Sequence, residues 1–173
     1  NKIISTGGGG AVVTQNKKYF NFIKKIGDVS RAKHDYELIY DNIGFNYKMP
    51  NLNASLGYSQ FKKLKSFLKY KIYLNETYKK LFKKFGTKIK MISNTKKTNS
   101  NFWLQSFILE NPKLRNKLIQ KCIKNNIFIK PIWKPLHKNN YVKRKFCQPD
   151  MKNTDYLFKR LICLPSSYNI LKK

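Results

Sequence analysis

The chain has 173 residues, of which 41% are hydrophobic and 26% are charged, so it holds enough apolar material for a packed core and is not wholly disordered. Its formal net charge of +29 would attract polyanions, which makes nucleic acid an immediate candidate partner. Specific phosphate and base recognition favours Arg, however, and only four of the 37 basic residues are Arg: Arg31, Arg115, Arg144 and Arg160. Because the lysines are also scattered along the chain, the composition argues against a dedicated nucleic-acid-binding protein.

The cysteines and the lengths of the apolar runs indicate the cellular compartment of the chain. Cys122, Cys147 and Cys163 are odd in number and show no CxxC spacing, which argues against a disulfide scaffold and a zinc site. Free thiols are typical of the reducing cytoplasm, the location that we predict. No apolar run approaches a membrane-spanning length, so we expect no membrane partner. The sequence does not begin with Met and opens inside a motif, so we expect a piece of a longer protein.

The first half of the chain predicts a glycine turn, a short strand and two helices. Residues 7–10 are four glycines, and the β-branched run at residues 11–14 favours a strand after them. Apolar residues between 19 and 26 have helical spacing, and Gly27 ends that helix. Residues 28–50 are irregular. Apolar steps of three and four then predict one long helix over residues 51–86, with a basic, solvated face.

The second half alternates between short strands and helices. We expect strands at residues 88–92, 102–109 and 127–129, with a polar loop over residues 96–101. A helix should begin at Asn111 and Pro112, and a last one, capped by Asn153 or Thr154, should run through Leu161. A loop rich in Pro spans residues 131–149. This order predicts an α/β layer behind the long helix.

Residues with obvious catalytic chemistry are sparse. The eight carboxylates show no paired spacing, and the two histidines, His34 and His137, suggest no catalytic triad. The glycine run is not a P-loop, because a P-loop needs Lys and Ser or Thr after its glycines at the start of a helix. Here the glycines precede the expected strand and Lys2 lies before them.

Four sequence blocks, in order, carry a resemblance to one enzyme family. They are residues 1–14 (NKIISTGGGGAVVT), 44–57 (GFNYKMPNLNASLG), 131–138 (PIWKPLHK) and 164–167 (LPSS). The first is similar to the lysine segment of the DegT/DnrJ/EryC1/StrS sugar aminotransferases, and the second to the G-x-N-x-R-M segment and the helix that follows it. The third resembles the family's P-x-x-x-P-L-H loop, and the fourth a common terminal pattern. Together the blocks span nearly the whole chain.

The resemblance implies an α/β chain that is the C-terminal part of a fold-type-I aminotransferase dependent on pyridoxal 5'-phosphate (PLP). Residues 1–50 would end the large PLP-binding domain, residues 51–86 would form a long linking helix, and residues 87–173 a small C-terminal α/β domain. The implied reaction transfers an amino group from glutamate to a keto-sugar linked to a nucleoside diphosphate, for surface glycans. The blocks look closest to 4-aminotransferases of the legionaminic acid and bacillosamine type. The family implies a cytoplasmic homodimer.

Site roles follow from the resemblance position by position. Lys2 would be the catalytic lysine that bonds covalently to PLP and then shuttles protons. Asn46 would contact the PLP phosphate of the neighbouring subunit. Lys48 stands where the family has Arg and would bind substrate without the bidentate fork of a guanidinium. His137 would also bind substrate, and Trp133 is expected to pack rather than to stack on a sugar.

Two further expectations concern the chain by itself. The family's acidic partner for the ring nitrogen, its stacking aromatic residue and most of its phosphate donors precede the lysine. We therefore expect this chain alone to be inactive and to expose apolar surface. The alternatives are a basic, non-catalytic module that binds nucleic acid or anionic surfaces, and a structural fragment that dimerises through the long helix. Polyanion binding would fall steeply with salt, which distinguishes the basic module from an enzyme.

Overall fold

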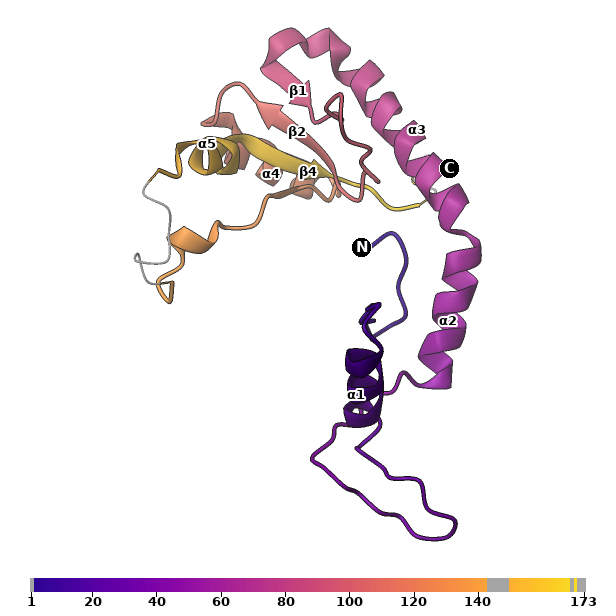
Figure 1. The fold of residues 1–173 in the computed structure, drawn as a ribbon. Coiled ribbons are helices and arrows are strands. Elements are labelled where there is room, and N and C mark those ends of the chain that lie inside the picture. Colours follow the sequence, from indigo (N-terminus) through magenta and orange to yellow (C-terminus); the bar gives the residue numbers. More distant parts are fainter. Residues whose placement is uncertain (1, 143–149, 169, 171–173) are drawn as a thin grey trace. The chain divides into compact units, whose positions relative to one another are not determined.

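A computed structural model describes residues 2–142, 150–168 and 170, and its chain divides into two compact units (Figure 1). Unit 1 combines Asn1–Ile3 with Lys65–Lys173, and unit 2 is Ile4–Leu64. The two units differ in how much apolar surface they bury.

Unit 1 is built on a four-stranded sheet. Strands β1 (Ile89–Met91), β2 (Gln105–Leu109), β3 (Lys130–Pro131) and β4 (Leu161–Leu164) lie in the order β1-β2-β4-β3, and all neighbours are antiparallel. Pairing sets Phe107 opposite Ile162 on the two central strands. The short strand β3 contains Pro131 and is confined to the edge, where its missing N–H breaks no ladder.

One apolar cluster holds unit 1 together. Phe107 and Ile162 are almost completely buried, and Phe82 of helix α3 (Leu64–Phe82) meets the Phe107 ring edge-on at a centroid distance of 5.5 Å. Ile119 of helix α4 (Leu114–Lys124) joins the same cluster. The other buried members are Met91, Leu109 and Ile129. A sheet face covered by helices confirms the predicted α/β class.

Local signals explain where the remaining elements of unit 1 begin and end. The 3-10 turn η1 (Lys83–Lys88) follows α3 and contains Gly86 in the left-handed region, at φ +57°. Helix α4 begins at Leu114 with Lys113 at its cap, later than the predicted start at Asn111 and Pro112, and the Asn111 side chain accepts a hydrogen bond from the Lys113 amide in the turn before it. Another 3-10 turn, η2 (Leu136–Lys138), precedes helix α5 (Lys152–Arg160).

Unit 2 contains two helices and very little core. Helix α1 (Lys17–Gly27) is capped by the side chain of Asn16, which accepts from the Lys18 and Tyr19 amides, and helix α2 spans Asn51–Lys62. Among the described residues of unit 2, Ser30 alone is buried, whereas Val13 is 93% exposed. The expectation of exposed apolar surface is therefore confirmed.

Three predicted elements differ from the structure. Residues 11–14 form no strand, since an extended run needs a partner and none of the described residues pairs with it. The predicted single helix over residues 51–86 is interrupted at Lys63, and its end beyond Phe82 is 3-10 rather than α. The strand expected at 127–129 begins three residues later, because Lys130 and Pro131 are the residues that pair with β4.

Strand β4 was not predicted, and the helix before it begins at a different residue from the one expected. Residues 161–164 follow α5 without a turn residue, so their apolar pattern merged with that of the helix. The last helix itself starts at Lys152, with Met151 rather than Asn153 or Thr154 at its cap. Residues 143–149, which include Cys147 and the end of the predicted loop over residues 131–149, lie outside the described residues. Within the described part of the chain, no helix is long and apolar enough to cross a membrane.

Candidate active site

Lys2 lies in unit 1 against an indole ring. Its Nζ is 3.5 Å from the centroid of the Trp103 ring, within the range of a cation–π contact, and the residue is exposed. Trp103 in turn lies 5.8 Å from Trp133, centroid to centroid, with the two rings tilted by 31°. The Trp133 ring is about half exposed and contacts the Trp103 ring and the ammonium of Lys130. The amine of Lys2 remains accessible to an aldehyde from solvent.

Asn46 and Lys48 lie together beside Asp28 in unit 2. Residues 43–47 run back along the end of α1: Phe45 donates to the Ile26 carbonyl, and Tyr47 to the Gly27 carbonyl at 2.9 Å. This places Asn46 in a β-bridge with Asp28, with its side chain exposed. The Lys48 ammonium forms an ion pair with the Asp28 carboxylate at 3.1 Å.

The residue that allows this close pairing is Gly44. A Cβ on Gly44 would lie 2.2 Å from the Val29 carbonyl carbon and 2.4 Å from the Ser30 nitrogen. Val29 and Ser30 both adopt φ +54°, which is a strained conformation for the β-branched Val29, and Ser30 Oγ donates to the Ile43 carbonyl at 3.0 Å. The Gly of the G-x-N-x-R-M-like segment therefore has a steric role: it lets the Asn46 segment lie against the turn after α1.

Gly44→Ala should release the Asn46 segment from α1. Overpacking of this kind typically costs about 1–3 kcal/mol, so amide hydrogen exchange at Val29 and Tyr47 should accelerate by about 10-fold or more. Gly10→Ala is the matched control, because its Cβ would meet no atom within 4 Å. Unchanged exchange in Gly44→Ala, measured by NMR, would contradict the steric role.

The glycine turn lies against α2 and borders an apolar hollow. Asn53 Nδ2 donates to the Thr6 carbonyl at 2.7 Å, and a Cβ on Gly57 would collide with the Thr6 side chain. Gly7 and Gly9 have φ of +77° and +125°, which L side chains rarely adopt. The hollow measures about 860 Å³ and is lined by residues of the turn, of α1 and of the segment 45–48. Its apolar lining suits a hydrophobic or aromatic group.

His137 lies in η2 of unit 1, paired with an aspartate. Its Nε2 is 2.9 Å from Asp155 Oδ1, and the Lys138 ammonium is 3.0 Å from Asp155 Oδ2. The His137 ring is mostly covered, and its Nδ1 is buried without a hydrogen-bond partner among the described residues. The Asp155 carboxylate thus fixes the orientation of the His137 ring.

The Asp155 pairing predicts an acid-labile contribution to stability. The hydrogen bond from Lys138, partly opposed by burial and assisted by His137, lowers the pKa of Asp155 below its ordinary value of 3.8. A lowered folded-state pKa stabilises the fold above 3.8, and this stabilisation is lost as the pH falls through the folded-state value. Lys138→Met should therefore reduce the unfolding free energy at pH 6 and flatten its decline below pH 4. Lys152→Met, at an exposed lysine, is the control; parallel acid profiles in Lys138→Met and the parent would contradict the pairing.

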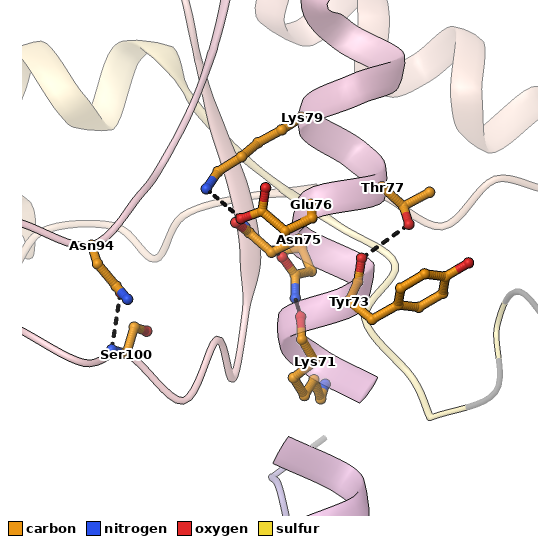
Figure 2. A network of polar contacts seen from close by, with 9 residues as sticks. Lys71, Tyr73, Asn75, Glu76, Thr77, Lys79, Asn94 and Ser100 are labelled. Atoms are coloured by element: carbon orange, nitrogen blue, oxygen red, sulfur yellow. Dashed lines mark hydrogen bonds and ion pairs between the residues drawn. The ribbon is translucent and has the colours of Figure 1, made fainter. Parts of the chain in front are cut away.

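The structure brings two of the four predicted site residues together and gives each of the other two its own partner. Asn46 and Lys48 share Asp28 in unit 2, whereas Lys2 and His137 belong to unit 1, where each contacts a different partner. Sequence reasoning missed Trp103, Asp28 and Asp155, the residues that these side chains touch. It also missed Lys71, a buried lysine on α3, which has no motif around it (Figure 2).

Comparison with known proteins gives a consistent family. The DegT/DnrJ/EryC1/StrS aminotransferase family matches residues 1–173. The chain is 28% identical over 150 residues to the GDP-perosamine synthase of Escherichia coli O157:H7. This alignment covers 84% of this chain and 39% of that protein. It is 27% identical over 169 residues to UDP-4-amino-4,6-dideoxy-N-acetyl-beta-L-altrosamine transaminase of Campylobacter jejuni strain 81-176, covering 95% of this chain and 44% of that protein.

A solved structure confirms the fold. PseC of Helicobacter pylori, an aminotransferase involved in the biosynthesis of pseudoaminic acid, aligns with a TM-score of 0.82 at 23% identity, over 95% of this chain and 45% of that chain. The chain thus spans less than half the length of these relatives. Since the family match extends over every residue, the chain belongs to the DegT/DnrJ/EryC1/StrS aminotransferase family.

Proposed function

We propose that this chain supplies the catalytic lysine and the small domain of a PLP-dependent aminotransferase that converts a nucleotide-linked keto-sugar into an amino-sugar. The observation that carries the proposal is the accessible amine of Lys2, followed by a glycine turn that is held on α2. Two relatives support the substrate class, because their names specify a GDP-linked and a UDP-linked sugar. Residues 1–50 would belong to the cofactor-binding domain, residues 51–86 to the linking helix and residues 87–173 to the small domain.

The described residues fit the part of PLP that a lysine holds. Among the described residues, Lys2 Nζ has a cation–π contact with Trp103 but no hydrogen bond or carboxylate partner, so no ion pair has to break before the amine reacts. Asn46 presents an exposed amide that can donate to a phosphate oxygen. When bound, PLP supplies an aldehyde carbon and an electron-accepting ring.

This chain's own residues then bind, orient and move protons. Lys2 would hold the cofactor through its amine, and the same amine would move a proton to and from the substrate carbon. Lys48 offers a positive charge to an anionic substrate group, moderated by its ion pair with Asp28. His137, whose ring is oriented by Asp155, would bind the sugar.

The proposal has three further parts. Glutamate is the amino donor, the protein is a homodimer in which Asn46 reaches the neighbouring subunit's cofactor, and its location is cytoplasmic.

The test is an amino-transfer assay on the protein that carries this chain, with glutamate and GDP- or UDP-linked 4-keto-6-deoxy sugars, followed by mass spectrometry of the product. We expect an amino-sugar nucleotide and 2-oxoglutarate in equal amounts. Absence of transfer with every nucleotide sugar, in protein shown to be loaded with PLP, would overturn the substrate class.

A further inference from the structure

Lys71 is a buried lysine that nothing in the proposed chemistry uses. It lies on α3, is 6% exposed, and its ammonium donates to two backbone carbonyls, that of Trp103 at 3.4 Å and that of Ser166. These carbonyls belong to segments 32 and 95 residues away in the sequence. Burial lowers the pKa of Lys71, and a lysine kept in such surroundings needs compensating oxygen partners.

A buried amide network fixes the backbone around Lys71. Asn75, one turn further along α3, donates to Gln105 Oε1 at 2.9 Å, and Gln105 Nε2 donates to the Lys71 carbonyl at 3.0 Å. Figure 2 shows Lys71 and Asn75 on neighbouring turns of α3. Gln105 of strand β2 thus bonds to helix α3 at two points, the Asn75 side chain and the Lys71 carbonyl, which fixes the backbone of α3 at Lys71.

The residue that Lys71 holds is the one that Lys2 touches. The Trp103 carbonyl accepts from Lys71 and also from Ser166 Oγ at 3.2 Å, while the Trp103 ring lies under the Lys2 ammonium. Phe102, the preceding residue, is buried at φ +47°, a strained conformation for a bulky side chain. Such a conformation persists only where surrounding contacts impose it, and the Lys71 and Ser166 hydrogen bonds are contacts of this kind.

We propose that Lys71 is a positioning residue for the Lys2 amine: by clamping the Trp103 and Ser166 carbonyls it fixes the Trp103 indole on which Lys2 rests. This inference rests on the proposed function, because the position of Lys2 matters only if its amine is the reactive group. Lys71 acts through Trp103 and touches no reacting atom.

The test measures the reactivity of Lys2 without any cofactor. The chain is acetylated briefly at fixed pH, and peptide mass spectrometry gives the rate at each lysine. A cation–π contact at an exposed site stabilises an ammonium enough to slow its reaction about two- to five-fold, so Trp103→Leu and Lys71→Met should each accelerate acetylation of Lys2 by about that factor. Lys69→Met, at an exposed position of the same helix, should not.

The double variant separates positioning from a general structural effect. If Lys71 acts through Trp103, Lys71→Met adds nothing in a Trp103→Leu background. Lys90, an exposed lysine on β1, should react at the same rate in every variant. Should Lys71→Met fail to fold, Ser166→Ala removes a second bond to the same carbonyl and should give a smaller acceleration in the same direction.

Three outcomes would overturn the inference. The first is an unchanged acetylation rate of Lys2 in folded Lys71→Met or, where that variant does not fold, in Ser166→Ala. The others are an equal acceleration at Lys90, and a double variant in which the two accelerations at Lys2 multiply. Because no PLP is present, a negative result would leave the proposed transamination intact. Conversely, a protein that fails to transaminate would leave the Lys71 result unaffected.

Discussion

Replacing Lys2 with Ala should abolish covalent retention of PLP and reduce amino transfer from glutamate by at least about 10²–10⁴-fold, the contribution of a positioned proton-transfer group alone. The reason is that Lys2 would both hold the cofactor and move the proton. The measurement is the initial rate of 2-oxoglutarate formation by the protein that carries this chain, with PLP in excess.

Two controls distinguish a lost amine from a lost fold in that experiment. Lys2→Arg keeps the charge and the contact with an aromatic ring but offers no nucleophilic amine, so it should be as inactive as Lys2→Ala. Lys17→Ala changes an exposed lysine of α1 and should retain full activity. A Lys2→Ala protein with the parent's turnover would end the proposal that this residue is catalytic.

Phe107→Ala should lower the unfolding free energy of unit 1 by about 3–5 kcal/mol, the usual cost of emptying a buried Phe site. Phe107 is 2% exposed on the central strand β2, where Phe82 packs edge-on against its ring, so neighbouring side chains cannot easily fill the space. Urea denaturation followed by circular dichroism measures the change.

Phe128→Ala provides a matched comparison, since the substitution is identical but Phe128 is 80% exposed. We expect its effect to stay within about 0.5 kcal/mol, as for most surface substitutions. Equal losses in the two variants would mean that the cluster around Phe107 is not the core of unit 1.

Elements whose signals are local were predictable from the sequence. Helix α1 begins after an Asn cap and ends at Gly27, and α4 follows the Asn111 turn. Strand β4 was missed because its role depends on pairing with β2 and β3, which no local signal in residues 161–164 reveals. Likewise, the helical spacing of apolar residues continues through Lys63, and no Gly or Pro stands there. The sequence therefore did not predict the interruption between α2 and α3.

Motifs located the candidate site residues but not their partners. Gly44 and Asn46 belong to one contiguous block, and the structure gives the glycine a steric reason. In contrast, the pairing of His137 with Asp155 joins residues 18 positions apart across two elements. Lys71 reaches carbonyls that only the tertiary fold brings near, so it could not be distinguished from the other lysines of α3.

The attachment point of the cofactor is the most direct test of the whole account. The protein that carries this chain is incubated with PLP, reduced with borohydride and digested, and the modified peptide is sequenced by mass spectrometry. We predict one dominant phosphopyridoxyl modification, on Lys2, that disappears in Lys2→Arg. Modification spread evenly over the chain's many exposed lysines, or dominant at any lysine other than Lys2, would contradict the assignment.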